Sequence, residues 1–343
     1  MRMATESEPV LRLRTADPCL PDCLSCDIVA TDVARLTSAS LAWCEAHGGP
    51  PHRTGPVDLA NPATAEFFDE RIRPALRHWR FDQLPSAASL IPMQRVDSCQ
   101  LTDGFPISAT DRLWFTHQSD ARGIRSRAAV LRALLSGDAA ARSGRHPRIR
   151  WLSLAAGAAL PVLEAMADLN DAGARLELDL VDDDRGALDL AEGFARQLGV
   201  SHSVRTRRMD ILRPQGLEPE LPAESFDAVE VLGLFEYLDD RPHDAYAGVV
   251  AGRRSIGAVG LLHNAWRLVR PGGRLVVANM LDSRPELDFV TTVLQWPHIH
   301  PRSIDQIVAL FDRAGIYEHR LRVDTPLDGV YAVVSVVKAR SSG

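Results

Sequence analysis

The sequence predicts an α/β fold with a Rossmann-like doubly wound sheet, mostly parallel with a C-terminal antiparallel hairpin, plus an N-terminal, mainly helical cap. Two observations predict the sheet. From about residue 146, short apolar runs alternate with helical patterns of about 10–15 residues, which is typical of βαβ units. The last two runs, 317–323 and 330–338, are joined by the turn residues Pro326-Leu327-Asp328-Gly329, which indicates an antiparallel pair.

Composition limits the class of protein. The 343 residues suffice for one large or two modest domains, and the hydrophobic share of 45% is ordinary for a globular chain. A net charge of −6 disfavours a nucleic-acid partner. No apolar run approaches ~20 residues, and the first residues lack a signal pattern, so we expect no membrane partner and a cytoplasmic protein.

Helical patterns precede the sheet. Residues 1 to about 25 are expected to form a loose arm. The apolar spacing predicts a helix from Asp27 to His47, a second over 63–79 that Pro74 bends or splits, and an amphipathic helix over 124–135 after an interruption at Gly123. We therefore expect residues 1–108 to form an arm and a helical cap that acts as a lid, and residues 109–343 to form the sheet domain.

The sheet domain opens with the stretch IRWLSLAAG at 149–157. It predicts a buried strand that ends in small residues, followed by a helix that begins near Pro161. A strand, a small-residue turn and a helix form the opening of a nucleotide-binding unit, with the helix N-terminus facing the ligand. Further strands are expected over four ranges: 176–181, 204–208, 226–232 and 274–279.

Five stretches in the sheet domain form a pattern: LSLAAG (152–157), LVDDDRGALDLA (180–191), RRMDIL (207–212), FDAVEVLGLFEYL (226–238) and AWRLVRPGGRLVVAN (265–279). Together they resemble the motifs of class I S-adenosylmethionine-dependent methyltransferases, of the bacterial small-molecule or natural-product type. Ser153 stands where an acid is common in the first motif, and Ala155 stands where glycine is usual. The resemblance covers roughly two thirds of the chain and implies S-adenosyl-L-methionine as cofactor and S-adenosyl-L-homocysteine as product.

The resemblance also implies where the cofactor binds. Asp182 would accept the ribose hydroxyls, although it could instead cap the next helix, a task that suits Asp184 better. Asp210 would accept from the adenine amine. Either Arg125 or Arg127 would reach the cofactor carboxylate, and Arg127 is preferred. The full set of candidate cofactor-binding residues is Arg127, Ala155, Gly157, Asp182, Asp183, Asp210, Ile211, Gly233 and Leu234.

The acceptor side is less defined. The stretch WPHIHPR at 296–302 has two histidines that could act as a general base, or it could be a turn held by its prolines. Trp114 and Phe115 could cover the acceptor, although an aromatic stripe is more often core. The candidate catalytic residues are His298, His300 and Tyr237, and the candidate substrate-binding residues are Trp114, Phe115, His117, Phe235 and Trp296.

Three N-terminal cysteines need a separate explanation. Cys19, Cys23 and Cys26 have the spacing that radical S-adenosylmethionine enzymes use for an iron–sulfur cluster, but those enzymes have a β/α barrel. A zinc site completed by Cys44 or His47 is a second alternative. The favoured interpretation is thiols without a metal.

The expected function is methyl transfer to a small-molecule acceptor, apolar or aromatic, such as an indole-type ring that is C- or O-methylated in secondary metabolism. Three alternatives stay open: carboxyl methylation of a hydroxy fatty acid, an NAD-dependent oxidoreductase, and a non-catalytic cofactor-binding protein. The missing G-x-G-x-x-G pattern and the final hairpin disfavour the oxidoreductase. A homodimer is compatible with the sequence.

Overall fold

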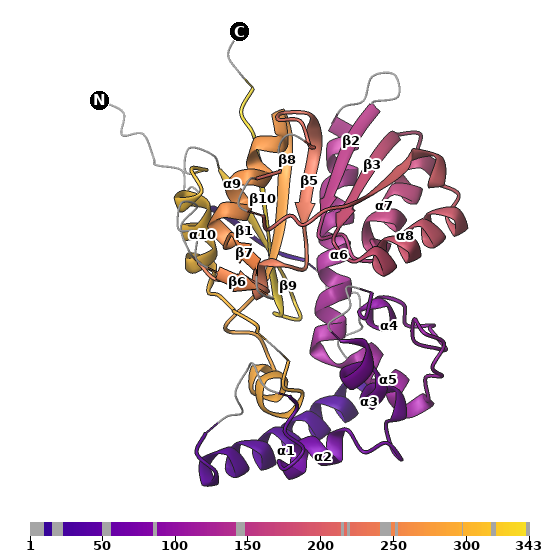
Figure 1. The fold of residues 1–343 in the computed structure, drawn as a ribbon, viewed down its shortest axis with the longest axis vertical. Helices are drawn as coiled ribbons and strands as arrows, with labels where there is room; N and C mark the ends of the chain where they lie inside the picture. The colour runs from indigo at the N-terminus through magenta and orange to yellow at the C-terminus, as the bar shows by residue number, and fades with distance from the viewer. Residues whose placement is uncertain are drawn as a thin grey trace.

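A computed structural model describes residues 10–15, 23–49, 56–84, 88–141, 148–213, 216–217, 220–240, 248–250, 253–296, 298–316 and 320–340. Within these residues the chain forms an eight-stranded sheet, with a helical lobe beyond one end of it (Figure 1). A separate antiparallel pair joins β6 (Gly248–Val250) to β7 (Arg253–Ser255).

The large sheet has the predicted mixed topology. Of its strands in the described residues, β10 alone runs antiparallel to its neighbours, β8 and β9, and all other neighbours are parallel. The mostly parallel sheet and its C-terminal hairpin are therefore confirmed. The spatial order is β1 (Val10–Thr15), β9 (Leu321–Pro326), β10 (Tyr331–Val337), β8 (Val269–Met280), β5 (Phe226–Val231), β2 (Arg148–Leu154), β3 (Arg175–Asp182) and β4 (Val204–Arg208).

Strand β1 corrects the expectation of a loose arm. It pairs in parallel with β9 over its whole length and extends the sheet beyond the hairpin. An edge strand leaves a row of backbone donors and acceptors open, and β1 supplies partners for those of β9. The alternation of apolar and polar residues in VLRLRT was the available sequence signal.

Helices cover both faces of the sheet, as a doubly wound fold requires. One face carries α6 (Ser119–Ala141), α7 (Leu160–Asp171) and α8 (Arg185–Gln197), and the other carries α9 (Ala258–Leu268) and α10 (Ile304–Arg313). Alternate residues of β2 divide accordingly. Trp151 packs with the first group and Leu152 with the second. Short 3₁₀ turns lie at Ser201–Ser203 and Phe235–Tyr237.

The helical lobe is assembled from two distant parts of the chain. Its aromatic core joins Phe67 and Trp114 to Phe289, whose segment follows β8. Pro74 starts a new helix, so the predicted split is confirmed. The domain boundary at 108 stays a prediction. The lobe contains α1 (Leu24–Ala46), α2 (Pro62–Phe67), α3 (Pro74–His78), α4 (Ile91–Gln94), α5 (Ala109–His117) and the π-helical turns Trp79–Gln83 and Phe289–Val293.

Among the described residues, no helix combines the length and the apolar character that a membrane crossing needs.

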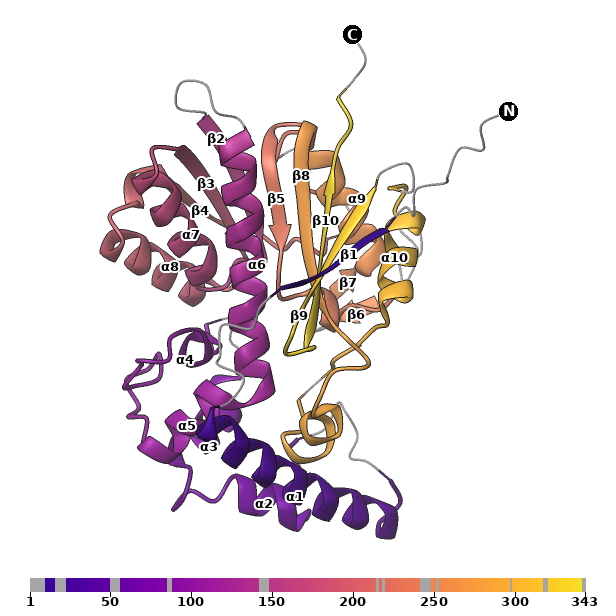
Figure 2. The same ribbon diagram turned by 180° about the vertical axis from the view of Figure 1, so that it is seen from behind.

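Helix α6 connects the lobe to the sheet (Figure 2). The expectation that Gly123 interrupts this helix is wrong, because α6 runs from Ser119 through it. Gly123 instead permits close packing. A Cβ at this position would lie 2.6 Å from the Cβ of Val330 and 3.0 Å from the ring of Tyr331. Real Cβ atoms do not approach that closely, so the helix lies against the start of β10 only because residue 123 has no side chain.

We expect Gly123→Ala to lower the free energy of unfolding by about 1–3 kcal/mol, the usual cost of overpacking. Gly137→Ala is the matched control on the same helix. Gly137 is exposed, and a Cβ added there would meet nothing within 4 Å, so the alanine should stabilise by about 1 kcal/mol through helix propensity. Urea unfolding of both variants checks this, and equal stabilisation of the two would contradict the packing argument.

Candidate active site

A cavity of about 350 Å³ lies where the carboxyl ends of β2, β3 and β5 meet. Strand β2 stands between β3 and β5, so the chain order reverses here, and such a switch point is where open α/β sheets bind ligands. All nine residues predicted to bind the cofactor line this cavity. The sequence thus located them together, while their individual roles stay predictions.

The turn after β2 forms one wall and has an unusual backbone. Gly157 adopts a left-handed conformation with φ of 55°, and Ala155 and Ala159 do the same at 51° and 54°. An alanine in this region costs about 1–2 kcal/mol. Hydrogen bonds hold the turn, because the Ala156 amide donates to the carbonyl of Val181 at 3.1 Å.

Three successive aspartates after β3 have three different environments. The buried Asp182 accepts from the amides of Gly157 and Asp184 at 2.8 and 2.9 Å, so it braces the turn after β2. Burial raises the pKa of Asp182, against the effect of these two bonds. Asp184 caps α8 by accepting from the Ala187 amide at 3.2 Å, as predicted. Asp183 is exposed at the cavity wall, and its carboxylate has no hydrogen-bond partner among the described residues.

Arg127 reaches the cavity from α6. Its guanidinium lies 3.4 Å from the Glu236 carboxylate and 4.5 Å from the ring centroid of Tyr331. Burial raises the pKa of Glu236, and its Oε2 atom is buried without a hydrogen-bond partner in the described part of the chain. Arg125 turns away and donates to two backbone carbonyls of the lobe, so Arg127 is the arginine that faces the cavity.

Glu230 is a cavity residue that the sequence interpretation missed. It lies on β5, beside Ser153 of β2, and is buried. Burial raises its pKa from 4.5 to about 7. An acid in the middle of the apolar strand FDAVEVL was the available signal, because buried carboxyls are rare without a partner.

The far wall of the cavity joins the lobe to the turn after β5. Trp296 from the lobe and Tyr237 from that turn line it, and the Trp296 indole donates to the Tyr237 hydroxyl at 2.8 Å. Burial raises the pKa of Tyr237 well above its ordinary value, so the phenol is neutral at physiological pH. Leu84, Leu90 and Ile91 complete this wall. The sequence interpretation missed them because residues 81–107 show no clear periodicity.

Six residues expected on the acceptor side do not line the cavity. His298 and His300 are exposed because the fully buried Ile299 between them takes the inward position. Phe235 packs in the core beneath α9. Trp114 stacks on Phe289 and Phe115 meets Trp79 edge-on, so both belong to the lobe core, and His117 lies beside Cys23 and Cys26. Pro297 of the WPHIHPR stretch lies outside the described residues.

The buried Glu230 should make the free energy of unfolding depend on pH. Its folded pKa of about 7 exceeds its unfolded value, so between about pH 4.5 and 7 the folded protein holds a proton that the unfolded chain has lost. Stability from this group therefore falls as pH rises through that window, by about 3 kcal/mol in total. We expect Glu230→Gln to remove this loss.

The measurement is urea unfolding of both proteins between pH 5 and pH 8. Other buried acids titrate in the same direction, so the difference between wild type and variant isolates Glu230. Parallel pH curves for the two proteins would show that Glu230 ionises normally.

Comparison with known proteins finds solved structures of similar fold but no similar sequence family. No family model and no curated protein matches the sequence. A solved structure described as a "possible exported protein" from Bordetella parapertussis is 17% identical, with a TM-score of 0.57, over 93% of this chain and 99% of that one. The S-adenosylmethionine-dependent methyltransferase SibL is 17% identical, with a TM-score of 0.46, over 91% and 97%. An O-methyltransferase family 2 protein from Planctomyces limnophilus, in complex with apigenin, is 14% identical, with a TM-score of 0.45, over 95% and 100%.

At 14–17% sequence identity, these similarities are evidence about the fold alone. The strand order β9-β10-β8-β5-β2-β3-β4, with β10 antiparallel, has the mostly parallel arrangement and the C-terminal hairpin that the sequence predicted. This open order, with different strands at its two ends, distinguishes the sheet from a β/α barrel. The chain thus has a mostly parallel, Rossmann-like α/β fold.

Proposed function

We propose that this protein binds S-adenosyl-L-methionine in the cavity and transfers its methyl group to a small apolar or aromatic acceptor. The proposal rests on the lining of the cavity, which has two chemically different parts. One part contains all nine residues predicted for the cofactor, and the other is an apolar surface that the lobe supplies.

The residues of the first part fit the cofactor chemically. Ala155, Gly157 and their small neighbours let a ligand approach the backbone. Asp183 presents to the cavity a carboxylate without a hydrogen-bond partner in the described ranges, which suits ribose hydroxyls better than Asp182, whose oxygens already accept backbone amides. Asp210 accepts from the Leu212 amide through Oδ1, which leaves its second oxygen for the adenine amine.

Arg127 would attract the cofactor carboxylate. Arg127 already contacts one carboxylate, because its Nη1 lies 3.4 Å from Oε1 of Glu236. That distance is longer than an ordinary charge-assisted hydrogen bond. Donor groups of the guanidinium are therefore available to a second carboxylate. Gly233 lies beside this guanidinium, since a Cβ at that position would be 3.1 Å from Nη2, so the glycine leaves room for it.

The second part of the wall would hold the acceptor. Leu84, Leu90 and Ile91 offer apolar surface, and the indole of Trp296 offers a flat face that suits a ring. The Tyr237 hydroxyl already accepts from Trp296 and could donate to one polar atom of the acceptor.

Methyl transfer makes few demands on the protein. The bound cofactor supplies a methyl group that its sulfonium already activates. The chain's own residues then need to align the acceptor and exclude water, which the apolar wall suits. His298 and His300 lie outside the cavity, so the proposal gives them no role in moving a proton.

The ribose assignment is tested with S-adenosylhomocysteine by titration calorimetry. Asp183→Asn should weaken binding by about 1–3 kcal/mol, because ribose hydroxyls lose a charged acceptor. Asp189→Asn is the matched control, an exposed aspartate on α8 outside the cavity, and should bind normally. Asp182→Ala should lower both affinity and the free energy of unfolding, since Asp182 also holds the Gly157 amide.

Two results would contradict this proposal. Unchanged affinity in Asp183→Asn would remove the ribose role. Binding of NAD without binding of S-adenosylhomocysteine would remove the methyltransferase assignment and favour an oxidoreductase on the same sheet.

A further inference from the structure

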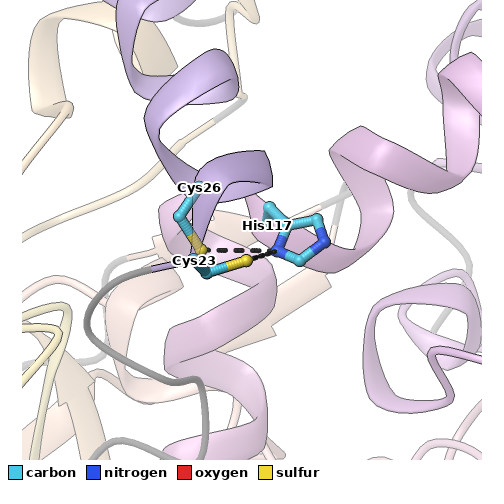
Figure 3. A group of neighbouring side chains, drawn as sticks. All are labelled: Cys23, Cys26 and His117. Atoms are coloured by element: carbon cyan, nitrogen blue, oxygen red, sulfur yellow. Dashed lines mark hydrogen bonds between the residues drawn. The ribbon is translucent and has the colours of Figure 1, made fainter.

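A cluster of two thiols and an imidazole lies in the lobe, apart from the cavity (Figure 3). Cys23 precedes the first turn of α1 and Cys26 lies within that turn, so both sulfurs project from the same helix end. His117 is the last residue of α5. The Sγ atoms of Cys26 and Cys23 lie 3.3 and 3.7 Å from His117 Nδ1, and all three potential ligand atoms lie within 4.8 Å of one another.

Hydrogen bonds link the three side chains to one another, since Cys23 also bonds with Cys26. Both sulfurs approach the same ring nitrogen, as Figure 3 shows. If Nδ1 carries a proton, it has one N–H to direct at two sulfurs. If it does not, it has one lone pair for two thiol donors. The nitrogen therefore serves one sulfur at a time in either tautomer, whereas a metal ion between the three atoms would contact all of them.

The distances fit a tetrahedral zinc site. With Zn–S of about 2.3 Å and Zn–N of about 2.0–2.1 Å, the S···N edge of a tetrahedron is about 3.6 Å. The two observed separations, 3.3 and 3.7 Å, lie on either side of that value. Thiolate and imidazole are also the ligand types that zinc prefers in proteins.

We propose that Cys23, Cys26 and His117 bind a Zn²⁺ ion. Three protein ligands leave one position of the tetrahedron for water or another donor. None of the three residues lines the cofactor cavity, so the ion would act on the lobe rather than on the methyl donor. It would fasten the beginning of α1 to the end of α5, and the free energy of metal binding would add to the stability of that junction.

This site differs from the zinc alternative considered from the sequence. Cys44 and His47 lie near the other end of α1, about 30 Å from Cys23 at 1.5 Å per residue. Cys44 is buried there, and His47 stacks on Trp43 with Nδ1 2.8 Å from the Trp43 carbonyl oxygen. Neither can join the cluster. Cys19, the remaining cysteine of the triplet, lies outside the described residues.

The test uses the full-length protein, purified, stripped with a chelator under reducing conditions and titrated with Co²⁺ as a spectroscopic probe. We expect one equivalent to produce the intense visible bands of tetrahedral Co²⁺ together with thiolate-to-metal charge-transfer absorption. Zn²⁺ should displace Co²⁺ and bleach these bands, and chelation should lower the melting temperature. Elemental analysis should find one zinc per chain in reconstituted wild type.

Variants assign the ligands. Cys26→Ser and His117→Ala should each weaken Co²⁺ binding at least tenfold. Cys99→Ser is the matched control, because Cys99 is an exposed cysteine away from the cluster, and it should bind as wild type does. Circular dichroism of each variant separates loss of a ligand from loss of the fold.

Two outcomes would overturn the proposal. Reduced wild type that takes up Co²⁺ without charge-transfer bands would have no thiolate site, and this result does not depend on any variant folding. Equal Co²⁺ affinity in wild type, Cys26→Ser and His117→Ala would place the ion elsewhere. Because the readout needs neither S-adenosylhomocysteine nor an acceptor, it is independent of the proposed methyltransferase activity.

Discussion

The close contact between α6 and the start of β10 is the constraint on which the rest of the structure depends. Asp120, Gly123 and Arg127 follow one another at helical spacing, so they lie on one face of α6. Asp120 pairs with the fully buried Arg284 at 2.5 Å, and Gly123 lies directly against Val330. Arg127 then reaches the Tyr331 ring and the cavity. One helix face thus sets the position of the lobe relative to the sheet and supplies a cavity residue.

The sheet and the grouping of the nine candidate residues around one cavity could be predicted because both depend on local patterns. Parallel strands bring their carboxyl ends to one edge, so the small residues after β2, Asp182 and Asp183 after β3, and Asp210 after β4 must meet there. The apolar wall of the cavity, which Leu84, Leu90, Ile91 and Trp296 line, could not be predicted in the same way. It joins Ile91, from a region without periodicity, to Trp296, some two hundred residues away, through tertiary packing alone.

The remaining errors also have physical causes. An isolated glycine inside a helical pattern predicts an interruption when its neighbour in space is unknown, and Gly123 acquires its purpose only from Val330. Strand β1 pairs with a strand some three hundred residues later, so its alternating pattern had no visible partner. In the His298–His300 loop, the inward position belongs to the apolar residue, which is the outcome that burial favours.

The cavity combines backbone strain with unfavourably placed acids. Ala155 and Ala159 hold conformations that cost free energy, and burial raises the pKa of two acids that line the cavity, Asp182 and Glu230. Such features persist where the surrounding structure enforces them, and they cluster at functional sites. Here the enforcing contact is visible, since Asp182 itself holds the Gly157 amide. The same carboxylate that would otherwise bind ribose stabilises the strained turn, which is why its neighbour Asp183 is the better candidate ligand.

The apolar wall of the cavity depends on how the lobe holds helix α4. Helix α4, which contributes Ile91, has four residues, and a helix that short has no stability of its own. Arg125 secures it, because its guanidinium donates to the carbonyls of Met93 at the end of α4 and of Thr116 on α5, at 2.8 and 2.5 Å. Thr116 immediately precedes His117, so a metal ion that fixes His117 to α1 would also fix the residue to which Arg125 anchors α4. The arginine that does not face the cofactor therefore links the proposed zinc site to the surface on which the acceptor would lie.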